Sequence, residues 1–173
     1  MNIKIYKIKS NTIKKIIFNK FLDKRGSFQR IFCKRNLKKI KFHLKQINLA
    51  KNLKAKTFRG FHYQKKNKED KIIIILKGKI IFYAVNINKL SKNYLKVFKI
   101  QISENSNFGL YIPSNFATAY FTLKSMTEII YYMSNYYYNN DAYGINYKDP
   151  KIKIKLPSQP KLISEKDKNW KFL

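Results

Sequence analysis

The chain is poor in the residues that build disulfide scaffolds and metal centres. It has one cysteine, Cys33, and two histidines, His43 and His62, among 173 residues. A single cysteine cannot form an internal disulfide, which fits a reducing compartment. A metal site in a β-fold usually takes several histidines with a carboxylate, and no His-x-His pair occurs here. We therefore expect no disulfide and no catalytic metal, and we interpret His43 as a surface or packing residue.

Long apolar runs are also missing. The densest runs, residues 72–76 and 80–85, are far too short to cross a bilayer. Residues 1–7 carry lysines where a signal peptide needs its apolar stretch, so no export signal is visible. These features favour a cytoplasmic protein without a membrane partner. With 45% hydrophobic residues, the chain can bury one core, and we expect a single domain over residues 1–173.

Acidic residues are scarce, and the formal net charge is therefore large. The chain has 9 Asp and Glu against 38 Lys and Arg, which gives +29. Such a charge is typical of nucleic-acid binding. However, the lysines are spread along the whole chain, and Lys, Ile, Asn, Tyr and Phe are all encoded by A- and T-rich codons. Base composition explains much of the excess, so we expect weak, salt-sensitive binding to polyanions and no specific nucleic-acid partner.

Short segments of alternating polarity predict an all-β fold. Residues 71–76 and 79–86 flank Lys77-Gly78, which predicts a tight hairpin. Helix signals are poor because β-branched and aromatic residues dominate. Further strands are expected at residues 44–49, 57–64, 95–102, 128–133 and 151–156, and a loop at the Asn- and Tyr-rich residues 135–141. Many short strands between turn residues indicate a β-sandwich or barrel of jelly-roll type with little helix.

The residues that suggest chemistry lie in two short stretches, 57–64 and 164–167. His62 occurs in the first, in a predicted strand, and Asp167 occurs in the second. Lys71 opens the next predicted strand. A base, a distant carboxylate and a cation on a rigid sheet are the groups needed to remove a proton from a carbon beside a carbonyl. This combination indicates an enzyme.

A series of short motifs runs from about Asp23 to Asp167. The motifs are residues 23–28, 46–48, 58–64, 69–71, 111–117, 131–134, Tyr137, 144–145 with 149–150, and 164–167. In composition and order they resemble the dTDP-4-dehydrorhamnose 3,5-epimerase family, whose members are cupin-like jelly rolls. The resemblance implies a cofactor-free isomerase that inverts C3 and C5, or C3 only, of a nucleotide-diphospho-4-keto-6-deoxy sugar in deoxysugar biosynthesis. It also implies a homodimer.

The resemblance assigns roles to single residues. His62 is expected to be the base, and Asp167 is expected to hold one ring nitrogen of His62 and fix its tautomer. Lys71 is expected to stabilise the developing enolate, and Tyr131 to return a proton to the opposite face of the carbon. The implied substrate-binding residues are Arg25, Phe28, Gln46, Asn48, Arg59 and Tyr137. Forked guanidinium groups suit a diphosphate, which is the part expected to contact the two arginines.

The chain departs from the family pattern at several pocket positions. Ala117-Thr118-Ala119-Tyr120 replaces Ala-His-Gly-Phe, so a histidine that helps to bind the sugar is absent at Thr118. Phe82 replaces an aspartate, and Arg30 replaces a glutamate at the nucleotide-base end. Two other classes therefore stay open. One is a relative with altered chemistry, either a 3,4-ketoisomerase or a non-catalytic sugar-nucleotide binder, and the other is a nucleic-acid-binding β-domain. The motifs do not specify the nucleotide base, the sugar or the number of carbons inverted.

Overall fold

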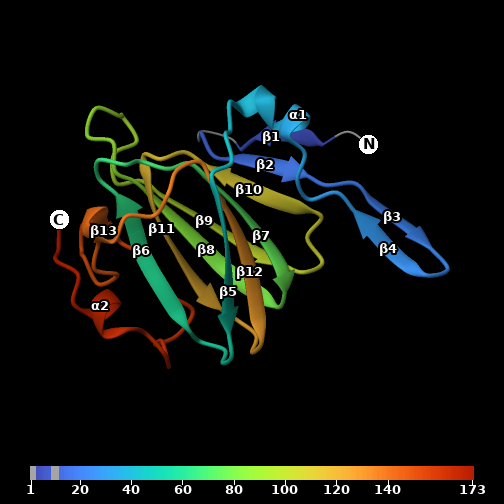
Figure 1. The fold of residues 1–173 in the computed structure, drawn as a ribbon. Coiled ribbons are helices and arrows are strands. Elements are labelled where there is room, and N and C mark those ends of the chain that lie inside the picture. The colour runs from blue at the N-terminus through green and yellow to red at the C-terminus, as the bar shows by residue number, and fades with distance from the viewer. Residues whose placement is uncertain (1–2, 9–11) are drawn as a thin grey trace.

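The computed structural model describes residues 3–8 and 12–173, which form two packed antiparallel sheets and a separate hairpin (Figure 1). The strands are β1 (Lys4–Lys7), β2 (Lys14–Ile17), β3 (Lys20–Asp23), β4 (Gly26–Gln29), β5 (Gln46–Asn52), β6 (Phe58–Gln64), β7 (Lys71–Lys77), β8 (Lys79–Asn86), β9 (Val97–Ser103), β10 (Phe108–Ile112), β11 (Phe116–Thr122), β12 (Thr127–Met133) and β13 (Ala142–Gly144). The helical turns are α1 (Lys34–Leu37), η1 (Lys38–Ile40), η2 (Asn139–Asp141) and α2 (Glu165–Lys168).

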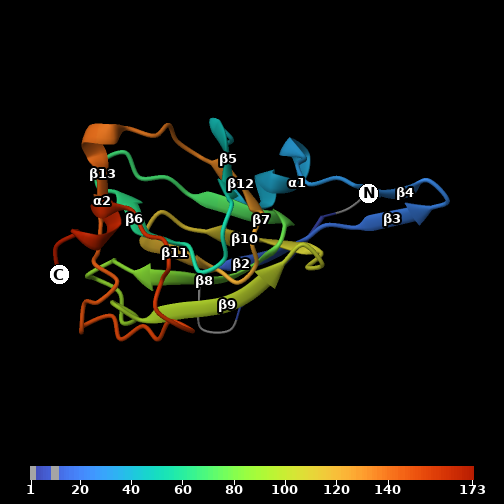
Figure 2. The same cartoon turned by 90° about the horizontal axis from the view of Figure 1, so that it is seen from below.

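The order of strands defines the two layers of the sandwich. One sheet has six strands in the order β1-β2-β10-β7-β12-β5, and the other has five in the order β13-β6-β11-β8-β9. Figure 2 shows β8 and β9 on the opposite side of the interior from β7 and β12. The hairpin of β3 and β4 belongs to neither sheet and extends away from both. The predicted jelly-roll fold with little helix is confirmed.

Strand β7 is covered on both faces, which explains its unbroken apolar run. Ile73 and Ile75 point into the interior between the sheets, where they pack with side chains of β8, β10 and β12. Ile72 and Ile74 belong to a second cluster on the outer face, which includes Leu37 beneath the short helices. A strand buried on both sides needs apolar residues at every position, and not only at alternate ones. Of the residues of β7, Lys71 at its start lines the cavity described below.

The prediction of a tight hairpin at Lys77-Gly78 was wrong. β7 pairs with β10 and β12, whereas β8 pairs with β11 and β9, so the chain crosses from one sheet to the other at this turn. Gly78 has a φ of 87°, a left-handed conformation that favours glycine. Its N–H donates to Glu104 and its carbonyl accepts from the Glu104 N–H. Both strands have two other partners, and alternation alone cannot reveal which strands share a sheet.

Residues 151–156 do not form the predicted strand. Ile152 is buried and Ile154 and Leu156 pack against the same cluster, so the alternation of buried and exposed side chains is correct. The backbone, however, turns at Lys153, whose φ is 43°. The carbonyl of Lys155 accepts hydrogen bonds from the side chains of Tyr83 and Lys99, and not from the backbone of a neighbouring strand. A lysine–isoleucine alternation therefore marks one buried face without requiring a sheet.

The remaining predicted segments agree with the structure to within a few residues. Strands β5, β6, β9 and β12 correspond to the predicted strands at 44–49, 57–64, 95–102 and 128–133. Residues 135–141 form the expected loop, which ends in the turn η2. Strands β1 to β4, β10, β11 and β13 were not predicted, because several of them are short or lack clear alternation. Within the described residues, no helix is long and apolar enough to span a membrane.

Candidate active site

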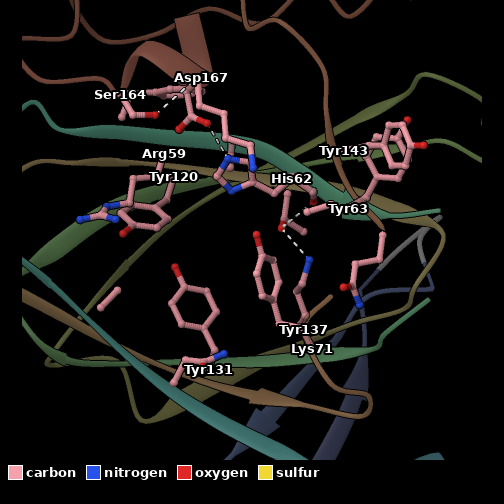
Figure 3. A pocket seen from close by; sticks show the side chains of 18 of the residues that line it. Arg59, His62, Tyr63, Lys71, Tyr120, Tyr131, Tyr137, Tyr143, Ser164 and Asp167 are labelled. Carbon is pink, nitrogen blue, oxygen red and sulfur yellow. Dashed lines mark hydrogen bonds and ion pairs between the residues drawn. The ribbon is translucent and has the colours of Figure 1, made fainter. Parts of the chain in front are cut away.

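A cavity of about 630 Å³ opens between the two sheets (Figure 3). It is lined by residues of β5, β6, β7, β11 and β12, together with the segment around α2. All four residues with an expected part in proton transfer line this cavity: His62, Lys71, Tyr131 and Asp167. They come from four different elements, so the fold brings together residues that are up to 105 positions apart.

His62 on β6 forms a short hydrogen bond with Asp167 on α2. The imidazole Nε2 lies 2.6 Å from Asp167 Oδ1. The side chain of His62 is 47% exposed, whereas that of Asp167 is only 4% exposed. In the neutral ring Nε2–H donates this hydrogen bond to the carboxylate, so Nδ1 carries no proton and can act as a base. Figure 3 shows the ring directed into the cavity.

Asp167 is held by three further hydrogen bonds. Its backbone N–H donates to the side chain of Ser164, the N-cap of α2, over 3.1 Å. Its Oδ2 accepts from the Gly60 N–H, and its Oδ1 accepts from the Trp170 indole. Burial works against ionisation, but the hydrogen bonds from His62, Gly60 and Trp170 outweigh it and lower the pKa of Asp167. The carboxylate is therefore fixed in place and ionised at neutral pH.

A local irregularity in β6 directs both Arg59 and His62 into the cavity. In a regular strand, residues three positions apart point to opposite faces. Here His62 pairs with Thr118 and Arg59 pairs with Tyr120, so three steps on β6 match two on β11. The extra residue lies at Gly60, whose φ is 131°, and a Cβ there would overlap Ala119. Glycine is needed at this position for both reasons.

Lys71 is anchored at the cavity wall by a buried ion pair. Its Nζ lies 3.0 Å from Glu69 Oε1, and the two side chains are 10% and 4% exposed. Nζ also lies 3.4 Å from the hydroxyl of Thr118. Gln64 donates to the other oxygen of Glu69 over 2.9 Å, which orients the carboxylate. The ammonium group is thus held beside the position where the absent family histidine would lie.

Tyr131 reaches the cavity from the sheet opposite to His62. It belongs to β12 of the six-stranded sheet, whereas His62 belongs to β6 of the five-stranded sheet. Burial raises the pKa of Tyr131 well above its ordinary value, so its hydroxyl is a neutral proton donor at neutral pH. Figure 3 shows this hydroxyl directed into the cavity from below, with the imidazole above it. A flat ligand between the two residues would meet a base on one face and an acid on the other.

Three of the expected binding residues line the cavity, and a fourth supports them. Arg59, Asn48 and Tyr137 are lining residues. Gln46 is not, but its side chain donates to Asn48 over 2.9 Å and accepts from the Tyr137 N–H over 2.9 Å. Gln46 therefore connects two lining residues and fixes the position of the Asn48 side chain relative to the backbone of Tyr137.

The other two expected binding residues, Arg25 and Phe28, do not reach this cavity. Both lie on the β3–β4 hairpin, which extends away from the sandwich (Figure 1). The guanidinium of Arg25 pairs with Asp23 over 2.7 Å and its side chain is 90% exposed. Phe28 is 63% exposed. Their role as substrate contacts stays a prediction, and within one chain the structure does not bring them to the site.

Several cavity residues were not predicted from the sequence. Trp170 lies edge-on to the His62 ring at 6.4 Å between centroids, and it also binds Asp167. It is the only tryptophan of the chain and follows Asp167 by three residues, a spacing that puts both on one side of a helical turn. These two facts could have indicated from the sequence that Trp170 lies beside Asp167 in the site. Glu69 was part of a motif but had no assigned role, and Tyr143 gave no signal.

A metal site is not apparent from the donor groups. In residues 3–8 and 12–173, no group of three or more His, Cys, Asp or Glu side chains could hold a metal ion. His43 is exposed and lies outside the lining of the cavity. The prediction that it is a surface residue is confirmed.

The fold and the cavity define a class of protein. A buried His–Asp pair, a cation and a neutral phenol on facing sheets of a jelly roll can remove a proton from one face of a carbon acid and return one to the other. Such groups belong to an isomerase that acts by proton transfer.

Comparison with known proteins gives the family. The family described as dTDP-4-dehydrorhamnose 3,5-epimerase matches residues 8–173. A protein of that name from Shigella flexneri is 32% identical over 86% of this chain and 84% of its own length. Another from Methanothermobacter thermautotrophicus is 26% identical over 88% and 85%. The chain belongs to the dTDP-4-dehydrorhamnose 3,5-epimerase family, as its motifs indicated, and the predicted isomerase class is confirmed.

Solved structures of relatives agree with this result. The dTDP-4-dehydrorhamnose 3,5-epimerase of Bacillus anthracis, with TDP and PPi bound, superposes with a TM-score of 0.93 at 26% identity and covers 99% of both chains. The enzyme from Sulfolobus tokodaii gives a TM-score of 0.90 at 28% identity, over 99% of this chain and 96% of that one. A Legionella pneumophila epimerase in complex with dTDP-4-keto-L-rhamnose gives 0.92 at 25% identity, over 99% and 93%.

Proposed function

We propose that the protein inverts C3 and C5, or C3 only, of a nucleotide-diphospho-4-keto-6-deoxy sugar in deoxysugar biosynthesis of the dTDP-rhamnose type. The observation that supports this most directly is the position of His62, paired with buried Asp167, across the cavity from Tyr131. The ligands named for the relatives from Bacillus anthracis and Legionella pneumophila support the substrate class. The reaction needs only proton transfers, which side chains can perform.

In the proposed mechanism, Nδ1 of His62 removes the proton from the carbon next to the ketone. The electron pair of the C–H bond forms the enolate, whose negative oxygen is stabilised by the ammonium group of Lys71. Asp167 stabilises the imidazolium that results. Tyr131 then gives its hydroxyl proton to the same carbon from the other face, which inverts the centre. His62 and Tyr131 regain their starting protonation states by exchange with solvent.

Arg59 is proposed to bind the diphosphate inside the cavity, with Asn48 and Tyr137 as further contacts. The guanidinium group of Arg59 uses its Nε to reach Asn52 over 3.1 Å. Its two terminal nitrogens are left for a ligand, and a fork of two N–H groups matches phosphate oxygens. Lys71 pairs with Glu69 and is assigned to the enolate oxygen, so Arg59 is the cation proposed for the diphosphate.

A homodimer is part of the proposal, because it explains the position of the β3–β4 hairpin. Phe21, Leu22 and Phe28 of this hairpin are 48%, 78% and 63% exposed, which is unfavourable for an isolated element in water. Strand β5 ends its sheet and exposes Ile47 and Leu49. We propose that the hairpin of each copy packs on the other and carries Arg25 and Phe28 to the partner's cavity. A cytoplasmic location and a single domain over residues 1–173 complete the proposal.

NMR of a dTDP-4-keto-6-deoxy sugar in deuterated water with the purified protein tests the function. We expect deuterium at C3, or at C3 and C5, together with signals of the inverted product. A matched His62→Ala protein should bind the nucleotide but incorporate no deuterium. The altered-chemistry alternative is favoured by Thr118 and Phe82, which line the cavity where the family has a histidine and an aspartate. A 3-keto product would establish the ketoisomerase, and binding without exchange would establish the non-catalytic binder.

A further inference from the structure

Tyr120 lines the same cavity as Tyr131 but belongs to the opposite sheet, the one that carries His62. It belongs to β11 and is 5% exposed, and its ring centroid is 6.5 Å from that of Tyr131. The two phenols act on each other: the Tyr131 side chain lowers the pKa of Tyr120, whereas the Tyr120 side chain raises the pKa of Tyr131. The motif that this stretch resembles, Ala-His-Gly-Phe, has phenylalanine where this chain has Tyr120.

Asn52 joins the Tyr120 hydroxyl to Arg59. The amide oxygen of Asn52 accepts from the Tyr120 hydroxyl over 3.0 Å and from Arg59 Nε over 3.1 Å. Its amide nitrogen donates to the Thr127 carbonyl over 3.1 Å, which fixes the orientation of the amide. Asn52 is only 3% exposed. A connected chain of polar groups therefore runs from Tyr131 through Tyr120 and Asn52 to Arg59.

The surroundings of the two phenols differ in how well they tolerate a negative charge. Burial raises the pKa of both, and that of Tyr131 is raised well above its ordinary value. The guanidinium group of Arg59 works against this rise at both residues, but the interaction between the two phenols lowers the pKa of Tyr120 and raises that of Tyr131. A negative charge left on the pair is therefore more stable on Tyr120 than on Tyr131.

Building on the proposed function, we propose that Tyr120 is a positioning residue that acts through Tyr131 as a proton relay. When Tyr131 protonates the substrate carbon, its O–H bond breaks and the electron pair of the enolate forms the new C–H bond. The Tyr120 hydroxyl turns from Asn52 and gives its proton to the Tyr131 oxygen. The negative charge thus moves from the enolate to Tyr120, beside Arg59, and solvent restores the Tyr120 proton.

Tyr120→Phe tests the relay because it removes one oxygen and keeps the ring. We expect formation of inverted product to fall roughly tenfold, which corresponds to the loss of one hydrogen bond to a charged group. Deuterium incorporation at the abstracted position should stay within about twofold, since His62 and Lys71 are unchanged. The rate of inversion should be measured against the fraction of heavy water in the solvent. We expect its dependence to fit two protons transferred in the rate-limiting step for the wild type, and one for the variant.

Tyr83→Phe is the matched control. Tyr83 is also a buried tyrosine, and it lies on β8 directly opposite Ala119 of β11. Its hydroxyl donates to the Lys155 carbonyl, and it is not a lining residue of the cavity. Its loss should change neither the rate of inversion nor the number of protons in flight.

Three outcomes would overturn the relay. If Tyr120→Phe kept the wild-type ratio of inversion to exchange, or lost both activities equally, Tyr120 would be a packing residue. If the wild type itself showed one proton in flight, no relay would operate, and this result does not depend on the folding of any variant. If the wild type catalysed no exchange, the proposed function would fail and the relay with it. If the wild type inverted the substrate and Tyr120→Phe did so at the same rate, the relay would be disproved while the proposed function would stand.

Discussion

At the scale of single residues, the proposed mechanism separates the removal of a proton from its return. His62 and Tyr131 lie on facing sheets, so each would meet one face of a sugar bound between them. The surroundings of the two residues also fit these two roles. His62 is about half exposed and hydrogen-bonded to a carboxylate, whereas burial keeps Tyr131 protonated. Burial thus keeps Tyr131 able to act as an acid, while the carboxylate orients the imidazole of His62 as a base.

Tyr131→Phe should separate inversion from exchange. Without the phenol, His62 still forms the enolate and returns the proton to its own face, so product should fall by about 100-fold or more while deuterium exchange is largely kept. The measurement is the ratio of inverted product to deuterated substrate, with Tyr83→Phe as control. Equal loss of both activities would make Tyr131 a binding or packing residue.

Asp167→Asn should affect both turnover and acid stability. The amide cannot fix the same tautomer of His62, so inversion and exchange should both fall by about 1,000-fold or more. The pKa of Asp167 is lowered in the folded state. Its ionised form therefore stabilises the fold at pH values above the ordinary pKa of 3.8, and this stabilisation is lost as the pH falls through the lowered pKa.

Urea unfolding of the Asp167→Asn variant between pH 3 and pH 6 would measure the second effect. We expect a weaker dependence of stability on pH than in the wild type. Glu165→Gln is the matched control, because Glu165 lies in the same helical turn and its side chain is 77% exposed. A wild-type pH dependence in Asp167→Asn would show that the carboxylate does not contribute to acid stability.

At the scale of elements, the sequence predicted where strands lie better than how they are arranged. Alternation located β5, β6, β9 and β12, because each has one face toward the interior. It could not show that the chain changes sheets at Gly78, since that depends on partners far along the chain. It also gave no sign that Arg59 and His62 share a face, because regular alternation places them on opposite faces.

The same limit applies to the site. The motifs identified His62, Lys71, Tyr131 and Asp167 as a set, and the structure brings all four to one cavity. The contacts that position them are not local. Asn52 meets Tyr120 across 68 positions, and Gly60 meets Asp167 across 107. A single sequence contains no periodic signal for such pairs, so they became visible only in the folded chain.

Gly60→Ala should destabilise the protein more than Gly26→Ala. Both glycines have a φ of 131°, so both substitutions carry the same backbone strain. At Gly26 the added carbon meets no atom within 4 Å, whereas at Gly60 it overlaps Ala119. We expect the loss in free energy of unfolding to be larger at Gly60 by roughly 1–3 kcal/mol, measured by urea denaturation. Similar losses at the two positions would show that β6 and β11 can move apart without cost.

At the scale of the whole molecule, the large positive charge and the site have different origins. Four of the nine acidic residues are buried: Glu69, Asp141, Asp149 and Asp167. Glu69 holds Lys71, Asp167 holds His62, and Asp141 and Asp149 accept hydrogen bonds from backbone N–H groups. Acids are thus kept where they bind a partner, while the lysines are dispersed. Drift in composition at the surface of an enzyme would leave this pattern, and the absence of a specific polyanion partner stays a prediction.

The quaternary arrangement of the site can be tested by mixing two inactive proteins. If the hairpin acts in the partner's cavity, His62→Ala and Arg25→Ala place their defects in different parts of a mixed dimer. One cavity then has both His62 of its own chain and Arg25 of the other, while the second cavity lacks both. Half of a randomly mixed population would contain one intact site, so about a quarter of wild-type activity should return after joint unfolding and refolding. Each variant refolded alone is the control. If Arg25 instead served the cavity of its own chain, every site would keep one defect and mixing would restore nothing.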